Sequence, residues 1–304
     1  MIKKVLHVYK ASGIRGVFRA VLRRFTPKRA ECLPLCKKLL SNGVGLEIGG
    51  PSGVFQRSGI LPIYSMINRL DNCNFSDQTT WEGTINEGMT FQYDVNRAPG
   101  RQYISEASDL QDIPSATYDF LLSSHVIEHV ANPLQALSEW IRVLSNEGIL
   151  ILLVPHKEGT FDHKRPVTSF DHLIADVENN TKEDDRTHLP EILAFHDLER
   201  DPAAGSLETF KQRSEKNVEN RCLHHHVFDT ALTIRLLSHM NLQIHAIENA
   251  LPFHIIAIAQ KTPLGQLPDN QAFFDEEAEH RRRSPFVSDK HPLAQGEGLI
   301  NHAS

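Results

Sequence analysis

The sequence predicts an α/β fold: a mostly parallel sheet that ends in an antiparallel pair of strands. Three observations support this prediction. A short apolar strand at 43–48 runs into a glycine-rich turn, residues 118–156 have the pattern strand, helix, strand, and residues 242–261 contain two strands joined by a short link. A chain of 304 residues, 40% of them hydrophobic, can bury one such core and still carry an insertion.

The first strand lies in GVGLEIGGPSG, residues 43–53, after a helix expected over 31–41. It carries one acid, Glu47, and the turn after it contains Gly49, Gly50 and Gly53. Glycines let the backbone approach a bulky ligand, and a carboxylate can compensate the positive charge of such a ligand. Their spacing is not the G-x-G-x-x-G that is typical of nicotinamide-binding folds.

The central unit begins with an apolar strand at 120–122. Asn132 is expected to cap a helix, with Pro133 at its first position and Gln135 where a capping box needs it. The run ILILLV, residues 149–154, is apolar on both faces, as a central parallel strand requires. A right-handed crossover in a parallel sheet follows.

The last predicted elements are a helix capped by Asp229 and two strands at 242–248 and 253–261. The four residues between these strands are too few for a parallel crossover. We therefore expect an antiparallel pair at one edge of the sheet.

These features together resemble a class I S-adenosylmethionine-dependent methyltransferase. The resemblance rests on the Glu47 and glycine turn, YDFLLSS, HVIEHVANPLQAL, RVLSNEGILILLVP and the closing hairpin, and covers residues 43–156 and 228–261. The most similar subgroup has "EH" after its fourth strand and includes bacterial sugar and polysaccharide methyltransferases. The resemblance implies a Rossmann-like, mostly parallel seven-stranded sheet with helices on both faces, and S-adenosylmethionine as cofactor.

It also implies the residues that bind the cofactor. In such enzymes the glycine turn passes under the methionine moiety, an acid ending the second strand holds the ribose, and an acid ending the third contacts the adenine. The residues that match these positions are Glu47, Gly49, Gly50, Gly53, Asp71, Glu106, Ala107 and Ser124. Asp109 competes with Glu106 for the adenine position.

The departure from the family is a long polar stretch, residues 157–227, which we call the lid. It follows a central strand, so we expect it to cover the active site. Methyl transfer to a hydroxyl needs a base, and the candidate catalytic residues are His125, His156 and His225. The candidate substrate-binding residues are Glu128, His129, Arg165, Arg221 and His226, with Glu128 and His129 equally explained as residues that order their loop.

A metal site is not expected, because no spacing matches a ligand motif. Two sets of lid residues stay open as alternatives: His188, Glu191, His196 and Asp197, or Asp162, His163 and Asp171. Three adjacent histidines, His224 to His226, cannot all face one point on a regular element.

Charge is distributed unevenly along the chain. Residues 1–30 carry nine Lys and Arg and no acid, although the whole chain has a net charge of −6. Apolar residues recur at helical spacing over 12–25, so this segment is an amphipathic basic helix. It would pack on its own fold or a second subunit, or lie on a membrane surface. An oligomer stays open, and nucleic acid is excluded as a partner because the remainder is acidic.

We expect a cytoplasmic enzyme, with the inner face of the membrane as an alternative location, because no apolar run could span a bilayer and no CxxC pair occurs. The expected parts are a basic N-terminal region (1–36), the methyltransferase domain with its lid (37–261) and a C-terminal extension (262–304). The expected activity is O-methylation of a sugar or other hydroxyl-rich acceptor, small molecule or glycan, in surface polysaccharide biosynthesis. A non-catalytic scaffold of the same fold in a membrane-associated assembly, or a nicotinamide-dependent sugar enzyme, are the alternatives.

Overall fold

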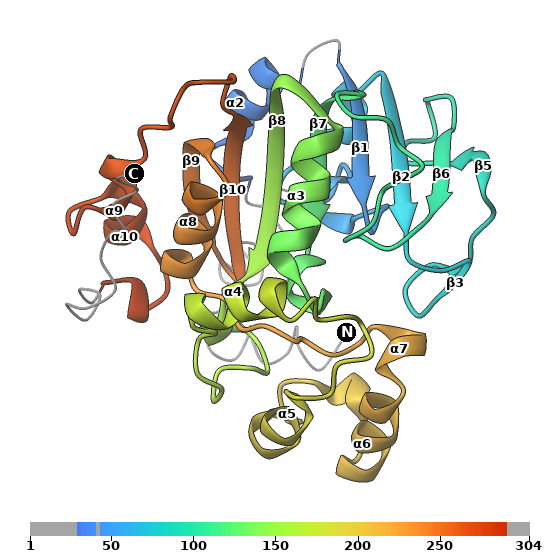
Figure 1. Cartoon of the computed structure of the whole chain (residues 1–304), viewed down its shortest axis with the longest axis vertical. Coiled ribbons are helices and arrows are strands. Elements are labelled where there is room, and N and C mark those ends of the chain that lie inside the picture. The colour runs from blue at the N-terminus through green and yellow to red at the C-terminus, as the bar shows by residue number, and fades with distance from the viewer. Residues whose placement is uncertain (1–28, 41–42, 291–304) are drawn as a thin grey trace, which may run out of the picture.

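The computed structural model describes residues 29–40 and 43–290 of the chain. Within them, one eight-stranded sheet runs in the order β5-β6-β2-β1-β7-β8-β10-β9 (Figure 1). Its strands are β1 (Val44–Ile48), β2 (Arg69–Asn74), β5 (Gly88–Phe91), β6 (Gly100–Ile104), β7 (Tyr118–Ser124), β8 (Leu144–Pro155), β9 (Leu242–Ala250) and β10 (His254–Lys261). The predicted α/β fold, Rossmann-like and mostly parallel, is confirmed, with β5 as one more edge strand than expected.

The parallel part of the sheet consists of β6, β2, β1, β7 and β8. In the register, Ile48 at the end of β1 lies beside Cys73 of β2 and Ser123 of β7. The carboxyl ends of these strands therefore meet at one edge of the sheet. In a doubly wound sheet, this edge is where ligands bind.

The C-terminal strands form the predicted antiparallel pair. Strand β10 lies between β8 and β9 and is antiparallel to both. His254, the first residue of β10, is paired with Pro155, the last residue of β8. An antiparallel strand thus brings its start to the edge where its neighbours end.

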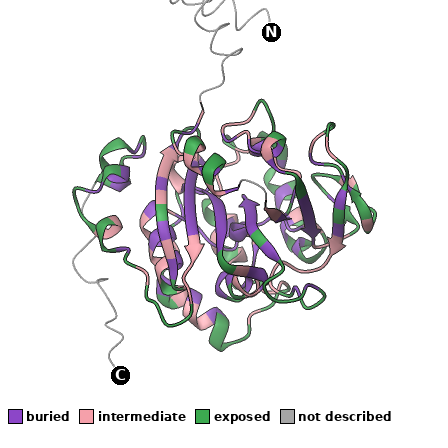
Figure 2. Cartoon of the chain, turned by 90° about the horizontal axis from the view of Figure 1, so that it is seen from above, coloured by how far each residue is buried: buried purple, intermediate pink, exposed green. Residues whose placement is uncertain are grey.

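Helices cover both faces of the sheet, and the buried residues lie along the central strands between them (Figure 2). One face packs on α3 (Pro133–Val143) and α8 (Thr230–His239), and the other on α2 (Leu33–Leu39) and two short 3-10 helices at 53–55 and 64–66. Strand β8 alternates between these two cores, as its apolar run predicts: Leu150 and Leu152 face one, Ile151 and Leu153 the other.

Two helix caps predicted from the sequence are confirmed. The Asn132 side chain accepts the backbone N–H of Gln135 at the start of α3, and the Asp229 side chain accepts that of Leu232 at the start of α8. Both helices begin directly after segments that reach the carboxyl edge. The caps therefore also fix the loops at that edge.

The lid contains α4 (Phe170–Glu178), α5 (Leu189–Phe195), α6 (Leu207–Glu215) and α7 (Asn217–Asn220). Figure 1 shows α4 at the carboxyl ends of the strands, with α5, α6 and α7 farther from the sheet. The small hairpin of β3 (Gln78–Thr79) and β4 (Gly83–Thr84) lies after β2. Residues of the sheet, this hairpin and the lid together line a cavity at the carboxyl edge.

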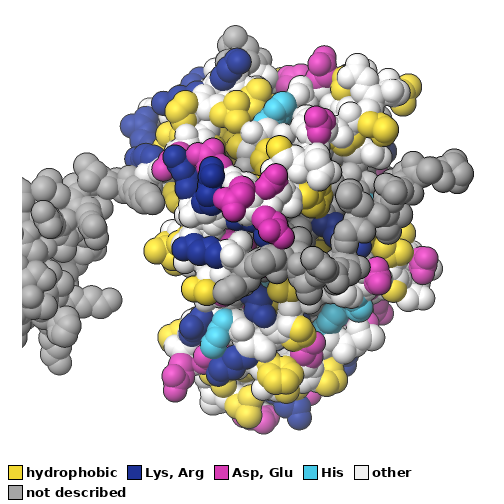
Figure 3. Space-filling view, turned by 90° about the vertical axis from the view of Figure 1, so that its left-hand side faces the viewer, with side chains coloured by type: hydrophobic (Ala, Val, Ile, Leu, Met, Phe, Trp, Pro, Cys, Tyr) yellow, Lys and Arg dark blue, Asp and Glu magenta, His cyan; other side chains and the backbone are white. Residues whose placement is uncertain are grey.

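The described part of the C-terminal extension packs on the domain through α9 (Gln271–Phe274), α10 (Glu279–Arg283) and a 3-10 helix at 288–290. Asn270 accepts the backbone N–H of Ile244 in β9, and Asp289 accepts from the Thr230 hydroxyl in α8. Acidic and basic side chains are interspersed on this side of the molecule (Figure 3). No helix among the described residues is long and apolar enough to cross a membrane. The basic helix expected over 12–25 lies outside the described residues.

Candidate active site

A cavity of about 510 Å³ opens at the carboxyl edge of the parallel strands. Its walls come from the ends of β1, β2, β6 and β7, from the β3–β4 hairpin, from the lid and from the start of β10. The residues that line the cavity include Gly49, Gly53, Asn74, Thr79, Trp81, Glu106, Ala107, Ser124, His125, His129, Glu183, Arg221, Phe253 and His254. The sheet therefore brings together residues that are far apart in the sequence.

The glycine turn forms the floor of this cavity. Gly49 lines the cavity and has a φ of 77°, and a Cβ there would lie 2.6 Å from the Val126 side chain. Gly53 also lines the cavity and has open space around the position of a Cβ. Both glycines thus lie where the sequence analysis placed them.

Glu47 and Gly50 have a different role from the expected one. The Glu47 carboxylate is fully buried beneath the turn and accepts hydrogen bonds from the Ser52 hydroxyl (2.6 Å) and the Tyr64 hydroxyl (2.7 Å). A Cβ on Gly50 would lie 2.4 Å from the Glu47 carboxyl carbon. Neither residue lines the cavity, so Gly50 makes room for Glu47, and Glu47 shapes the turn from below.

Burial raises the pKa of Glu47 to about 7, against the hydrogen bonds from Ser52 and Tyr64, which lower it. Desolvation therefore raises the pKa of Glu47 by more than the two side-chain hydrogen bonds lower it. A carboxyl group in this state does not supply a full charge to a ligand at neutral pH. Its direct contribution here is to hold the turn.

The second-strand acid was assigned wrongly. Asp71 lies in the middle of β2, where it is buried and accepts from the Tyr118 hydroxyl (3.0 Å) and the Arg101 backbone N–H (2.9 Å). The residue that ends β2 at the cavity is Asn74, three positions later. The physical reason is strand length: β2 continues to Asn74, so an acid three residues earlier cannot reach the edge.

The end of β6 places Glu106 and Ala107 on the cavity wall. Glu106 also receives Arg221 from the lid, whose Nη2 lies 2.6 Å from its Oε1, and a second carboxylate, Glu183, pairs with the same guanidinium. Burial raises the pKa of Glu106 although Arg221 opposes this shift. Arg221 thus forms ion pairs with two carboxylates and links the lid to the wall of the cavity.

His125 and His254 form a pair on the opposite side. Nε2 of His125 lies 2.9 Å from Nδ1 of His254, and both rings line the cavity. Burial, and then the neighbouring His254, lower the pKa of His125 to about 3, and burial lowers the pKa of His254 to about 4. At neutral pH the pair is uncharged, so one ring nitrogen remains a proton acceptor.

The backbone holds His125 in an uncommon conformation. Its φ is 56°, a left-handed value that costs a residue with a Cβ about 1–2 kcal/mol. Its N–H donates to the Leu153 carbonyl of β8 (2.9 Å). Its Nδ1 lies 3.7 Å from Oε1 of Glu128, which is itself buried. Such strain is typical of residues that a site positions for function.

The two other candidate bases lie away from the cavity. His156 is fully buried, stacks on Phe286 with ring centroids 3.9 Å apart and lies 3.3 Å from Asp289 of the C-terminal extension. His225 is buried in the lid, where its Nε2 lies 3.0 Å from the Asn217 amide. For His156, the prediction from strand position missed that a later segment, with Phe286 and Asp289, covers the ring. His225 lies in the lid, as expected, but its ring is bonded to Asn217 of the lid and does not line the cavity.

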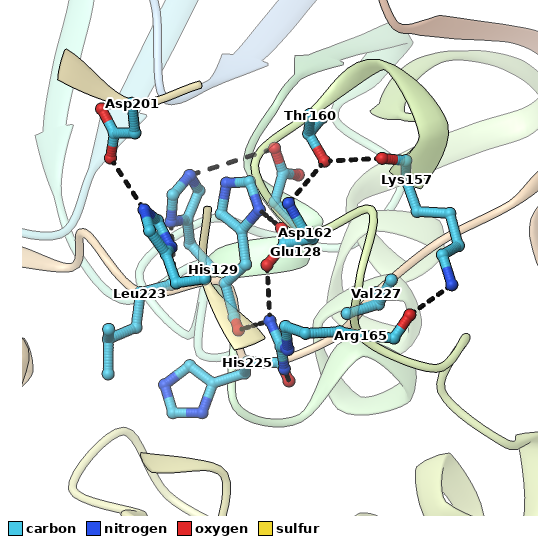
Figure 4. A network of polar contacts seen from close by, with 12 residues as sticks. Glu128, His129, Lys157, Thr160, Asp162, Arg165, Asp201, Leu223, His225 and Val227 are labelled. Atoms are coloured by element: carbon cyan, nitrogen blue, oxygen red, sulfur yellow. Dashed lines mark hydrogen bonds and ion pairs between the residues drawn. The ribbon is translucent and has the colours of Figure 1, made fainter. Parts of the chain in front are cut away.

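Two of the candidate substrate-binding residues are also structural. Arg165 is buried in the lid, where its guanidinium pairs with Asp162 (2.9 Å) and donates to two backbone carbonyls (Figure 4). It also pairs with Glu191 (2.8 Å). His226 is buried behind the cavity and lies 3.3 Å from the Ala131 carbonyl. His129 lines the cavity, and Glu128 contacts it at 3.9 Å from beneath. The structure thus separates the five candidates into two residues that line the cavity, His129 and Arg221, one buried residue next to His129, Glu128, and two inside the lid.

Glu128, His129 and His224 each offer a ligand atom within 4.8 Å of the others. Two of them are engaged elsewhere, because Nδ1 of His129 lies 2.9 Å from the Leu223 carbonyl and Nδ1 of His224 is bonded to Asp162. Burial disfavours a charged His224, but the Asp162 carboxylate outweighs it and raises the pKa of the ring. The hydrogen bonds to Leu223 and Asp162 fix the orientation of the two rings.

Sequence reasoning missed His254, Asn74 and Trp81 of this cavity. His254 had a topological signal: it starts a strand antiparallel to its neighbours, so it lies at the edge where they end. Asn74 ends β2 in the stretch where an acid was sought. Trp81 comes from the β3–β4 hairpin, which no hydrophobic or turn pattern in the sequence predicts.

Residues 85–152, which include β6, β7, α3 and most of β8, match the family described as "Methyltransferase domain". This match covers less than half of the chain. No curated protein sequence matches the chain.

Three solved structures illustrate the similarity in fold. A SAM-dependent methyltransferase from Aquifex aeolicus is 12% identical with a TM-score of 0.40, over 76% of this chain and 90% of that chain. One from Methanosarcina mazei is 15% identical with a TM-score of 0.42, over 76% and 98%. The 1,6-didemethyltoxoflavin-N1-methyltransferase of Burkholderia thailandensis, with bound S-adenosylhomocysteine, is 12% identical with a TM-score of 0.41, over 86% and 89%.

The family match includes the strand, loop and helix that carry Glu106, Ala107, Ser124 and His125. The cavity fits the cofactor of that family, because Gly49 and Gly53 leave two positions of its floor without a side chain, and polar residues at the ends of β2 and β6 line its wall. The match and the cavity together support a class I S-adenosylmethionine-dependent methyltransferase, with S-adenosylmethionine as the cofactor.

Proposed function

We propose that the chain transfers a methyl group from S-adenosylmethionine to a hydroxyl oxygen of a sugar or another hydroxyl-rich acceptor. The observation that carries this proposal is the His125–His254 pair: two uncharged histidines, 2.9 Å apart, on the wall of the cavity. A hydroxyl is a weak nucleophile and needs a base, and an uncharged histidine has a ring nitrogen whose lone pair can take the hydroxyl proton. A role in surface polysaccharide biosynthesis rests on the sequence resemblance alone.

The sulfonium of the bound cofactor supplies an activated methyl group and its own leaving group. A hydroxyl acceptor would lose its proton as it takes the methyl group, so the site needs a side chain that can hold this proton. His254 is the residue we assign as acceptor of that proton. If Nδ1 of His254 donates to Nε2 of His125, Nε2 of His254 keeps its lone pair.

Glu128 supports this tautomer. Its Oε1 lies 3.7 Å from Nδ1 of His125, and burial raises the pKa of Glu128 to about 7, so the partial negative charge of this group favours a proton on that nitrogen without a hydrogen bond. The Nε2 of His125 is then the acceptor that His254 needs. We therefore assign His254 as the base, His125 as the residue that positions it, and Glu128 as the group that orients His125.

The acceptor side of the cavity offers the half-exposed indole of Trp81 and the Thr79 hydroxyl. Aromatic faces and hydroxyls suit a sugar, which presents apolar C–H faces and many hydroxyls. Arg221 and Arg165 each pair with two carboxylates, so neither has charge left for an anion. We therefore propose a neutral acceptor rather than an acidic one.

The first test is calorimetric titration of the purified chain with S-adenosylmethionine and, separately, NAD. Radiolabelled methyl transfer to a panel of neutral sugars follows, with nucleotide sugars as the anionic comparison. His254→Gln should lower kcat at least about 100-fold with little change in the cofactor Kd, because it removes the base. The matched control is His245→Gln, an exposed histidine of β9, which should leave kcat unchanged.

The pH profile gives a second readout. A histidine with the ordinary pKa of 6.5 would be about 90% protonated at pH 5.5, whereas a pKa of about 4 leaves His254 unprotonated there. The rate at pH 5.5 should therefore stay within about two-fold of the rate at pH 7. S-adenosylmethionine binding without transfer to any acceptor, in the wild type, would favour the non-catalytic scaffold. Binding of NAD alone would overturn the proposal.

A further inference from the structure

Within the lid, four side chains converge on one point away from the cavity. His172, His188 and His226 each place a ring nitrogen within 4.8 Å of the other two. Asp176 lies one helical turn after His172 in α4, and its Oδ2 is 3.6 Å from Nε2 of both His172 and His226. We propose that His172, Asp176, His188 and His226 form a zinc site that ties the lid together.

The distances are those of a tetrahedral site. A Zn–N distance of about 2.0–2.1 Å places neighbouring ligand atoms of a tetrahedron about 3.3 Å apart. The observed separations are 2.9 Å between Nε2 of His172 and Nε2 of His188, and 3.6 Å from Oδ2 of Asp176 to each of two imidazoles. Three imidazoles and one carboxylate are ligands that suit Zn²⁺.

The rings meet edge to face rather than stacked. The His172 and His188 rings are inclined at 81° with centroids 4.7 Å apart, and the His188 and His226 rings at 77° with centroids 5.3 Å apart. This arrangement lets several rings direct a nitrogen toward one point, as metal-bound imidazoles do.

Hydrogen bonds alone leave this group unsatisfied. Oδ2 of Asp176 is buried and has no hydrogen-bond partner among the described residues. Nε2 of His226 lies 3.3 Å from the Ala131 carbonyl, and coordination through this nitrogen would replace that contact. The other oxygen of Asp176, Oδ1, accepts from the Thr181 hydroxyl (3.1 Å), which fixes the carboxylate and turns Oδ2 toward the histidines. Such an outer hydrogen bond commonly orients a ligating carboxylate. A cation would satisfy the unpaired oxygen, which is otherwise costly to bury.

A metal ion would add stability to the lid, which has a small apolar core of its own. Its own core cluster has four buried residues, Ile192, Ala204, Phe210 and Leu223. So small a core rarely stabilises a segment by itself, and small folds commonly add a metal. The four ligands come from α4, from the start of α5 and from the segment that leads back to the sheet. The ion would hold α5 to α4, and α4 lies against the sheet (Figure 1).

The site also adjoins the cavity wall through the backbone, since the His226 N–H donates to the Glu128 carbonyl (3.3 Å). It uses one residue, His188, from the cation sets left open by the sequence, but with other partners. Glu191 pairs with Arg165, and His196 and Asp197 pair with Asp201 and His163. The three adjacent histidines do face three ways: His224 to Asp162, His225 to Asn217 and His226 to the zinc site.

The test is titration of the full-length chain, made without a polyhistidine tag and stripped with a chelator, with Co²⁺ and Zn²⁺. The wild type should bind about one ion per chain and show the visible absorption of tetrahedral Co²⁺. His188→Ala and Asp176→Asn should each weaken binding at least about ten-fold. The matched control is His163→Ala, a half-buried lid histidine that pairs with Asp197 outside the group, and it should bind as the wild type does.

Zinc should also protect the lid of the wild type from limited proteolysis, and should not protect that of His188→Ala. His188 is half-buried, so this variant should fold, and its circular dichroism spectrum is the check. A wild type that binds neither ion, or a folded His188→Ala that binds them as tightly as the wild type, would overturn the site. The readout is metal binding, so the result is independent of methyl transfer.

Discussion

The buried carboxyl group of Glu47 should make the chain less stable as the pH rises. Burial raises its pKa to about 7 in the folded state, against 4.5 when exposed. The folded state therefore holds a proton that the unfolded state has lost between these two values, and folding becomes less favourable through this window. At about 1.4 kcal/mol per pKa unit, the penalty is about 1 kcal/mol at pH 5 and about 3 kcal/mol at pH 8.

Glu47→Gln removes this ionisation and keeps the shape. Its carbonyl oxygen can accept from Ser52, and its amide can donate to the Tyr64 oxygen. The free energy of unfolding of the variant relative to the wild type should therefore rise by about 2 kcal/mol between pH 5 and pH 8. Urea denaturation at both pH values measures it, with Glu87→Gln, an exposed glutamate, as the control for loss of one acid. Equal differences at the two pH values would refute the assignment of the penalty to Glu47.

Three further substitutions test the positions of single residues. Gly49→Ala should destabilise the fold by at least about 1–2 kcal/mol, because φ is 77°, whereas Gly53→Ala, with open space around it, should unfold at the wild-type urea midpoint. Asp71→Asn should lower the free energy of unfolding by about 1–3 kcal/mol, because it weakens two buried hydrogen bonds. Because Asp71 lies in mid-strand, the calorimetric Kd for S-adenosylmethionine should stay unchanged. A weakened Kd would restore the assignment of Asp71 to the ribose. Arg165→Met should leave Asp162 with His224 as its remaining ionic partner and Glu191 without Arg165, and should cost about 3 kcal/mol. Proteolysis should become faster within the lid than elsewhere, and uniform proteolysis would contradict this.

The order and direction of the central strands could be predicted because each rests on a local signal. The Asn132 cap, the apolar run of β8 and the four-residue link before β10 each allow few alternatives. The segment between β1 and β2 carried no such signal. It contains two 3-10 turns among its described helices, at 53–55 and 64–66, and this irregularity is why the length of β2 was misjudged.

The cavity was harder to predict than the fold. Gly49, Glu106 and His125 follow the ends of strands, and the end of a strand can be read from the sequence. His156 also ends a strand, but Phe286 and Asp289, more than a hundred residues later, cover it. A contact at that separation leaves no local pattern.

The polar residues of the lid show why residue type alone did not separate substrate contacts from structure. A segment with a small apolar core must hold its helices by other means, and buried polar groups then need partners inside the segment. Arg165 takes two carboxylates, His224 takes Asp162, and His226 faces Asp176. Many of the His, Asp and Arg side chains that suggested a polar acceptor thus pair with one another inside the lid. What the lid presents to the cavity is a neutralised Arg221, and this is the reason to screen uncharged, hydroxyl-rich acceptors before anionic ones.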